Sequence, residues 1–129
     1  MKVIVAGSRS IKDYALVAKA IEGVDIQITE LVSGTAKGVD QLGERWATEN
    51  QVPIKRFPAD WKNLDAVGAV VRTGHYGQYN AKAGFDRNKQ MADYAEALVA
   101  VYDGKSKGTA SMIKLAREQG LQVFVYKPT

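Results

Sequence analysis

The sequence predicts a single α/β domain in which a mostly parallel, five-stranded sheet carries helices on both faces. Short apolar runs alternate with segments of helical periodicity, which is the pattern of strand–helix–strand crossovers. Several of the runs are continuously apolar, as buried parallel strands are, rather than alternating. The 129 residues suffice for one domain, residues 1–129, and the 46% of hydrophobic residues suffices for its core.

The expected strands are short apolar runs that are rich in β-branched residues or bounded by turn residues. Pro53 opens the third run, and the first, fourth and fifth are the strongest. The runs are 2–6 (KVIVA), 31–33 (LVS), 54–57 (IKRF), 97–102 (ALVAVY) and 121–126 (LQVFVY).

Four helices are expected between these strands, because apolar residues recur at spacings of three and four. Asp13 is the expected N-cap of the first helix, and Gly120 is the expected C-cap of the last. The helices are marked by Tyr14, Val17, Ala18 and Ile21; by Val39, Leu42, Trp46 and Ala47; by Met91, Tyr94 and Ala95, starting near Phe85; and by Met112, Ile113 and Ala116.

Composition narrows the function classes. The net charge of +4 favours phosphate-bearing partners but does not by itself indicate nucleic-acid binding. With no cysteine and one histidine, the chain has no disulfide or thiol chemistry, and we expect neither a metal nor a cofactor. The first apolar run is too short for a signal peptide or a membrane span, so we expect a cytoplasmic protein without membrane contact.

Three glycine-rich turns carry the chemistry, each between an expected strand and an expected helix. They are residues 7–9 (GSR), 33–40 (SGTAKGVD) and 103–109 (DGKSKGT). Because the carboxyl ends of parallel strands meet at one edge of a sheet, we expect the turns to converge on one crevice. Neither the Walker A spacing nor the dinucleotide fingerprint is present, and each turn taken singly could be only a tight structural turn.

The turns and the start of the third expected helix supply donors and charges suited to a phosphate-bearing ligand. We expect backbone and hydroxyl groups of Gly34, Thr35, Gly38, Gly108 and Thr109 to donate to phosphates. Arg9, Lys37 and Arg87 would supply charge, and Asp40 and Asn88 would contact ribose or base. The full candidate set is Gly7, Ser8, Arg9, Gly34, Thr35, Ala36, Lys37, Gly38, Asp40, Arg87, Asn88, Asp103, Gly104, Lys107, Gly108 and Thr109.

One stretch, residues 62–83, shows no clean period. A stretch of this length in a compact domain is usually a functional loop or a mobile segment. We expect a lid or subunit-contacting loop beside the crevice, with a solvated insertion without a role as the alternative. The side chains that could close over a base or phosphate are Arg72, His75, Tyr76 and Tyr79.

The three turns, together with residues 57–61 (FPADW) and 87–91 (RNKQM), resemble the YspA-related family of the SLOG superfamily. The resemblance runs through nearly the whole chain in the right order. It implies a Rossmann-like fold and a nucleotide-derived ligand, and superfamily habit implies a homo-oligomer. In this superfamily such domains often act as sensors or binders in bacterial and phage conflict systems.

The same superfamily contains the Lonely Guy phosphoribohydrolases, whose signature is Pro-Gly-Gly-x-Gly-Thr-x-x-Glu with an upstream arginine. Arg87 matches that arginine and 108–109 match the Gly-Thr pair, but Asp103 stands at the proline and Lys105 departs from the paired glycines. Met112 stands at the glutamate, so the acid/base carboxylate is missing. The comparison therefore favours binding over hydrolysis.

Taken together, the sequence predicts a protein that senses or sequesters a phosphate-bearing, nucleotide-derived small molecule. One alternative is an enzyme of the nucleotide N-glycosidase type. Another is a single-stranded nucleic-acid binder, by loose likeness to the DNA-processing DprA branch of the superfamily.

Overall fold

The computed structural model describes residues 1–60, 71–74, 77–80 and 82–128. At its centre is a parallel sheet whose five strands all pair in parallel with their neighbours. Across the sheet the order is β3 (Ile54–Arg56), β2 (Glu30–Ser33), β1 (Lys2–Gly7), β6 (Ala97–Val101) and β7 (Gln122–Tyr126). The five expected strands are all present, with ends that differ by one residue at most.

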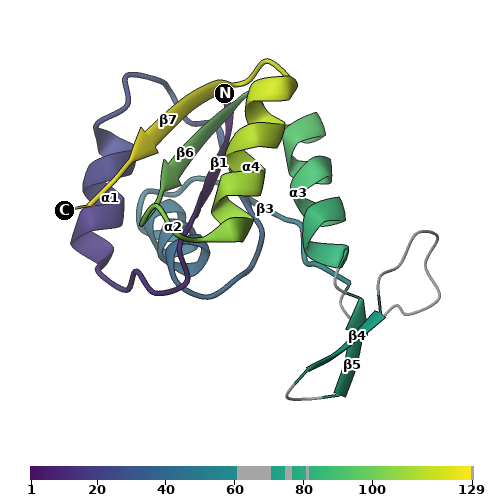
Figure 1. Ribbon diagram of the computed structural model, residues 1–129. Helices are drawn as coiled ribbons and strands as arrows, with labels where there is room; N and C mark the ends of the chain where they lie inside the picture. The colour runs from purple at the N-terminus through teal and green to yellow at the C-terminus, as the bar shows by residue number, and fades with distance from the viewer. Residues whose placement is uncertain (61–70, 75–76, 81, 129) are drawn as a thin grey trace.

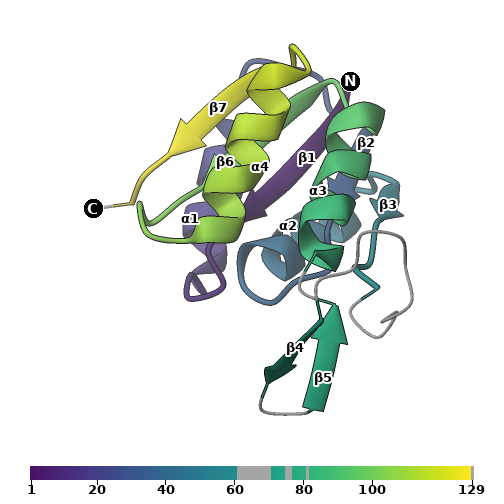
Figure 2. The same cartoon turned by 45° about the vertical axis from the view of Figure 1, so that its right-hand side comes forward.

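Two helices cover each face of the sheet (Figures 1 and 2). On one face lie α1 (Tyr14–Glu22) and α2 (Val39–Glu49), and on the other lie α3 (Ala83–Tyr94) and α4 (Lys107–Glu118). Strand residues alternate between the two cores. Val3 and Val5 pack with α1 and α2, whereas Ile4 packs with α3 and α4. The central strands are therefore apolar on both sides, which explains their continuous hydrophobicity.

Capping interactions bound α1 and α4 at or next to the residues that the sequence predicts. The Asp13 carboxylate accepts from the Leu16 N–H at 3.4 Å and begins α1. At the end of α4 the C-cap is Gln119, and Gly120 is one residue further on, with φ at +79°. The Gly120 and Leu121 N–H groups donate back into the last turn at 3.1 and 3.0 Å, which is a Schellman motif. The third helix begins two residues before the expected Phe85.

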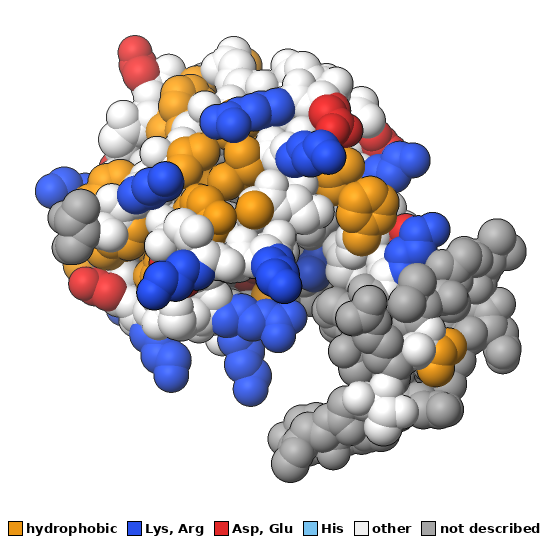
Figure 3. All heavy atoms as spheres, in the orientation of Figure 1, with side chains coloured by type: hydrophobic (Ala, Val, Ile, Leu, Met, Phe, Trp, Pro, Cys, Tyr) orange, Lys and Arg blue, Asp and Glu red, His pale blue; other side chains and the backbone are white. Residues whose placement is uncertain are grey.

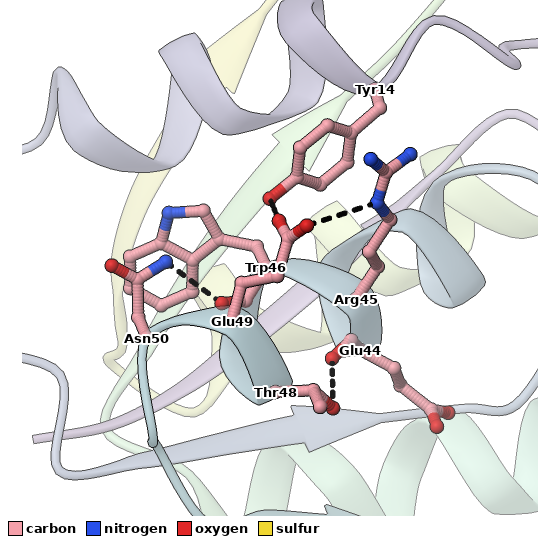
Figure 4. A network of polar contacts seen from close by, with 7 residues as sticks. All are labelled: Tyr14, Glu44, Arg45, Trp46, Thr48, Glu49 and Asn50. Atoms are coloured by element: carbon pink, nitrogen blue, oxygen red, sulfur yellow. Dashed lines mark hydrogen bonds and ion pairs between the residues drawn. The ribbon is translucent and has the colours of Figure 1, made fainter.

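A polar network joins α1 to α2 on the outer surface (Figure 4). The Tyr14 hydroxyl donates to the Glu49 carboxylate, and the Arg45 Nε donates to the same carboxylate at 3.4 Å. The Arg45 guanidinium also lies 3.9 Å from the centroid of the Tyr14 ring. These exposed contacts orient the two helices but add little to stability compared with the core beneath them.

The segment 62–83 holds a regular element that periodicity did not predict. Strands β4 (Val71–Gly74) and β5 (Gly77–Asn80) pair antiparallel, with Val71 opposite Asn80. Strands this short show no readable period. In Figures 1 and 2 the hairpin lies apart from the five-stranded sheet, beyond the amino-terminal end of α3.

The sheet has a topological switch point between β1 and β6. From β1 the chain proceeds outward to β2 and β3 on one side, and it then returns to the other side of β1 to form β6 and β7. In open α/β sheets this arrangement leaves a crevice beyond the carboxyl ends of the two central strands. Within the described ranges, no helix is long and apolar enough to span a membrane.

Gly7 is what allows β1 and β6 to end side by side at the switch point. A Cβ on Gly7 would lie 2.1 Å from the Val101 carbonyl oxygen and 2.8 Å from the Val39 Cγ2. By contrast, a Cβ on Gly108 would meet nothing within 4 Å. The two glycines therefore have opposite tolerances for a side chain.

We expect Gly7→Ala to lower the free energy of unfolding by about 2 kcal/mol or more, because backbone cannot retreat from the added methyl group. Gly108→Ala is the matched control, and it should leave stability unchanged or raise it by up to about 1 kcal/mol through helix propensity. Urea denaturation followed by circular dichroism measures both. Equal stability of the two variants would contradict the close approach at Gly7.

Candidate ligand-binding site

A cavity of about 360 Å³ opens at the switch point, beyond the carboxyl ends of β1 and β6. We call it the switch-point cavity. Of the sequence-predicted residues, it is lined by Gly7, Ser8, Arg9, Ala36, Asp40, Arg87, Asn88, Asp103, Gly108 and Thr109. It is also lined by Ala6, Ser10, Met91 and Ser106, which sequence reasoning missed, and by Met112.

The turn after β1 is tied to the turn after β6. Ser8 is buried; its N–H donates to the Val101 carbonyl at 3.1 Å, and its hydroxyl oxygen accepts from the Asp103 N–H at 3.1 Å. These bonds fix the first wall of the cavity. Ser8 thus holds two turns together and also lines the cavity.

The turn after β6 is organised by its own side chains. The Asp103 carboxylate accepts from the Lys105 and Ser106 N–H groups at 2.7 and 2.9 Å, and these bonds hold the pKa of Asp103 below its usual range. Ser106 then caps α4 by accepting from the Thr109 N–H at 3.3 Å. An ionised carboxylate therefore sits just before the amino-terminal end of α4.

The turn after β2 has an internal support. The Ser33 hydroxyl donates to the Glu44 carboxylate at 2.7 Å and accepts from the Thr35 N–H at 3.1 Å, while Thr35 adopts a φ of +62°. Glu44 in turn pairs with Arg56 at the end of β3, at 2.8 Å. Both neighbours of this turn, α2 and β3, are thereby anchored to it.

Gly38, in the same turn, packs against the turn after β1 rather than facing the switch-point cavity. Its φ is +78°, and a Cβ there would lie 2.6 Å from the Ser8 carbonyl oxygen and 2.7 Å from the Arg9 Cα. A valine at this position would therefore destabilise the fold itself, because its side chain would collide with backbone and would also strain φ.

Arg87, at the start of α3, connects the turn after β2 to the rest of the site. Its guanidinium donates to the Gly34 carbonyl oxygen and, through Nε, to the Asn88 Oδ1 at 3.0 Å. The Asn88 amide donates onward to the Gly108 carbonyl at 3.3 Å. Arg87 and Asn88 together thus connect the turn after β2 to the first turn of α4.

Gly34 lets a carboxylate and a guanidinium approach each other. A Cβ on Gly34 would lie 2.8 Å from both the Arg87 Nη1 and the Asp40 Oδ2. Asp40, which is 5% exposed, accepts through Oδ2 from the Ala36 N–H at 3.2 Å. Gly34 is therefore required for the juxtaposition of Asp40 and Arg87, although it does not itself line the cavity.

Burial dominates the electrostatics of this pair. It raises the pKa of Asp40 to about 6, although the Ala36 N–H and the nearby Arg87 and Arg9 guanidinium groups act to lower it. Burial likewise lowers the pKa of Arg87, which Asp40 opposes. An ionisable group that costs stability and lines a cavity is a frequent sign of a functional site.

Some predicted residues do not line the switch-point cavity. Lys37 and Gly38 line a neighbouring hollow that also includes Arg9. Arg72 lies in β4 and Tyr79 in β5, while His75 and Tyr76 fall outside the described residues. The other predicted residues that do not line the cavity are Gly34, Thr35, Gly104 and Lys107. Among the described residues, no group of three or more His, Asp or Glu side chains could hold a metal ion.

The fold defines a Rossmann-like α/β domain with an open cavity at its switch point. Residues 1–64 match the family described as YspA, cpYpsA-related SLOG family, which confirms the resemblance seen in the sequence. The matched region includes the turns after β1 and β2 but neither Arg87 nor the turn after β6.

The chain is also similar to the X-ray structure of DNA processing protein A (DprA) from Streptococcus pneumoniae. The TM-score is 0.70 at 21% sequence identity, and the match covers 96% of this chain and 49% of that chain. At this identity the likeness shows the fold alone, and the chain spans about half the length of that structure. No curated protein matches the sequence.

Replacing the Asp40 carboxylate by a neutral amide tests how much the buried charge lowers the free energy of unfolding. The pKa rises from 3.8 to about 6 on folding, so the native state binds the proton more tightly. The free energy of unfolding therefore falls as pH rises through this interval and levels off above it. Asparagine stays neutral and can still accept from the Ala36 N–H.

We expect Asp40→Asn to be more stable than the wild type at pH 7.5, by about 1–2 kcal/mol. The difference should vanish near pH 4, where both side chains are neutral. Urea denaturation at a series of pH values measures it. A variant that is less stable than the wild type at pH 7.5 would show that the attraction of the nearby Arg87 and Arg9 guanidinium groups outweighs the cost of burial.

Proposed function

We propose that the switch-point cavity binds a small, phosphate-bearing ligand derived from a nucleotide, and that the protein senses or sequesters it without turnover. The observation that carries the proposal is the buried Asp40 beside Arg87, both lining one cavity at the switch point. The match to a SLOG family over residues 1–64 supports it.

The lining suits a nucleotide in its chemistry. Asp40 and Asn88 offer acceptors and donors for ribose hydroxyls or a base edge, and Arg9 and Arg87 offer charge for phosphate. Met91 and Met112, which are each 1% exposed, give the cavity an apolar wall. At about 360 Å³ the cavity is at the lower end of the range of about 300–1,000 Å³ that is usual for small-molecule sites.

Catalysis is a second candidate because of one observation. A carboxyl with a pKa near 6 is poised for proton transfer at neutral pH, and Asp40 lines the cavity. Against it, Met112 stands where the related phosphoribohydrolases carry their glutamate, and a thioether can neither give nor take a proton.

The third candidate is nucleic-acid binding. The similar structure is that of a DNA processing protein, and likeness of fold does not transfer that role.

A thermal-shift screen tests ligand binding. The panel holds nucleoside mono-, di- and triphosphates, cyclic nucleotides, dinucleotides and ADP-ribose compounds. A ligand at 100 times its dissociation constant should add about 2.7 kcal/mol of stability, a rise of several degrees in Tm. Arg87→Lys, which loses the planar fork, should weaken binding at least tenfold, whereas the exposed Lys89→Gln on the same helix should not. No shift with any compound, in folded and ligand-free protein, would refute the proposal.

Incubation with nucleoside monophosphates tests for turnover. We expect no release of free base above the rate in buffer, because the acid/base glutamate is replaced by Met112. Chromatography of the mixture after several hours measures the release. Base release that Asp40→Asn abolishes would establish the N-glycosidase candidate in place of binding alone.

A further inference from the structure

A groove of about 720 Å³ lies between α4 and β7, at one edge of the five-stranded sheet. We call it the edge groove. It shares no lining residue with the switch-point cavity, because the two spaces lie on different faces of α4. Figure 3 shows hydrophobic side chains gathered in the region of β7 and α4, with Lys and Arg side chains around them. The larger apolar side chains of the lining are Tyr102, Ile113 and Val125, and its cations are Lys114, Arg117 and Lys127.

β7 is an end strand of the sheet, so the backbone groups of its alternate residues face outward. The Gln122 N–H donates to the Glu96 carbonyl, just before β6, at 3.2 Å. Residues 122, 124 and 126 therefore face β6, and the N–H and C=O groups of Val123 and Val125 point away from the sheet. Within the described ranges, no strand pairs with this outer edge.

The two edges of the sheet are protected differently. β3, at the other edge, is three residues long and carries two exposed cations, Lys55 and Arg56. β7 has five residues and no charge, and its Val125 and Tyr126 are both 37% exposed. Short strands and charged side chains are the usual protection of an edge against an added strand. The edge at β7 has neither, so another strand can pair with it.

The charges of the edge groove favour an acidic partner. Among the described lining residues, three cations face one carboxylate, Glu118. That carboxylate lies 4.0 Å from the Lys114 Nζ in an exposed pair, which contributes little. In the described part of the chain, neither Arg117 nor Lys127 forms an ion pair, and the Lys127 Nζ lies 5.9 Å from the centroid of the Tyr102 ring. Positive charge therefore remains uncompensated beside the apolar surface.

These charges disfavour a second copy of this chain as the partner. Each copy has a net charge of +4, and antiparallel pairing of two β7 strands would bring both sets of groove cations to one interface. Like charges across an interface oppose association. A segment that carries carboxylates beside apolar side chains meets no such repulsion.

We propose that β7 and the edge groove bind an extended, acidic peptide segment of a partner protein by strand addition. The segment's backbone pairs with Val123 and Val125, and its alternate side chains face α4. An apolar side chain of the segment packs against Ile113 and Val125, and flanking carboxylates pair with Arg117 and Lys127. This interaction is separate from ligand binding in the switch-point cavity and does not depend on it.

A display selection with random decapeptides, carried out on the whole folded chain, tests the chemistry of the partner. We expect enriched sequences in which β-branched or aromatic residues alternate with others and acidic residues outnumber basic ones. Enrichment of basic sequences, or no enrichment above an unrelated immobilised protein, would overturn the proposal.

Hydrogen exchange of the ¹⁵N-labelled protein tests the mode of binding, with the most enriched peptide as the probe. The Val123 and Val125 amides should exchange at least tenfold more slowly when the peptide is bound, because they gain acceptors. The amides of residues 107–109, beside the switch-point cavity, should keep their rates. Peptide binding without protection of Val123 and Val125 would overturn strand addition.

Variants test the cations. The double variant Arg117→Gln/Lys127→Gln should weaken binding of the same peptide at least tenfold in isothermal titration calorimetry. The charge-matched control Lys19→Gln/Lys89→Gln, on α1 and α3, should bind as the wild type does. Equal losses in the two double variants would mean that net charge alone attracts the peptide, and would overturn the site.

Sedimentation velocity separates a peptide partner from a second copy. We expect the sedimentation coefficient of the peptide-free chain to be insensitive to blocking of this edge by the peptide, apart from the added mass. A dimer that the peptide dissociates, and in which Val123 and Val125 are already protected from exchange, would assign the edge to a second copy and overturn the proposal.

Discussion

The contact of Gly38 with the backbone of Ser8 and Arg9 is the constraint on which the site depends. A side chain at Gly38 would push apart the turns that follow β1 and β2. Gly7 plays the corresponding part between β1 and β6, where the Val101 carbonyl occupies the space of a Cβ. Two glycines thus bring three turns to one edge, and the cavity exists because of this convergence.

Around that edge, one dipeptide couples elements that are distant in the chain. Arg87 bonds to the Gly34 carbonyl, and Asn88 bonds to the Gly108 carbonyl. The start of α3 therefore bridges the turn after β2 and the start of α4. If the cavity binds a ligand as proposed, such bridging fixes its polar groups in advance and lowers the entropy lost on binding.

Asp40 shows where the fold gives up stability. A carboxylate buried almost completely, with a pKa near 6, opposes folding at neutral pH. A protein selected for stability alone would place an amide or an apolar group there. The arrangement is understandable if the carboxylate contacts a bound ligand, because the lost folding stability then accompanies a gain in ligand recognition.

Sequence alone determined the five-stranded sheet, the helices and the edge at which the turns meet. These features follow from local periodicity, helix capping and the glycine-rich turns between strands and helices. Only the tertiary structure decided which turn residues face a cavity. Gly108 borders open space, whereas Gly38 is packed against backbone, although the two look alike in sequence. The approach of Asp40 to Arg87, and the gathering of Lys12 and Lys37 around Arg9, also arise only when separate segments meet. No local pattern encodes such juxtapositions, because side-chain proximity and desolvation depend on the packing of the whole chain.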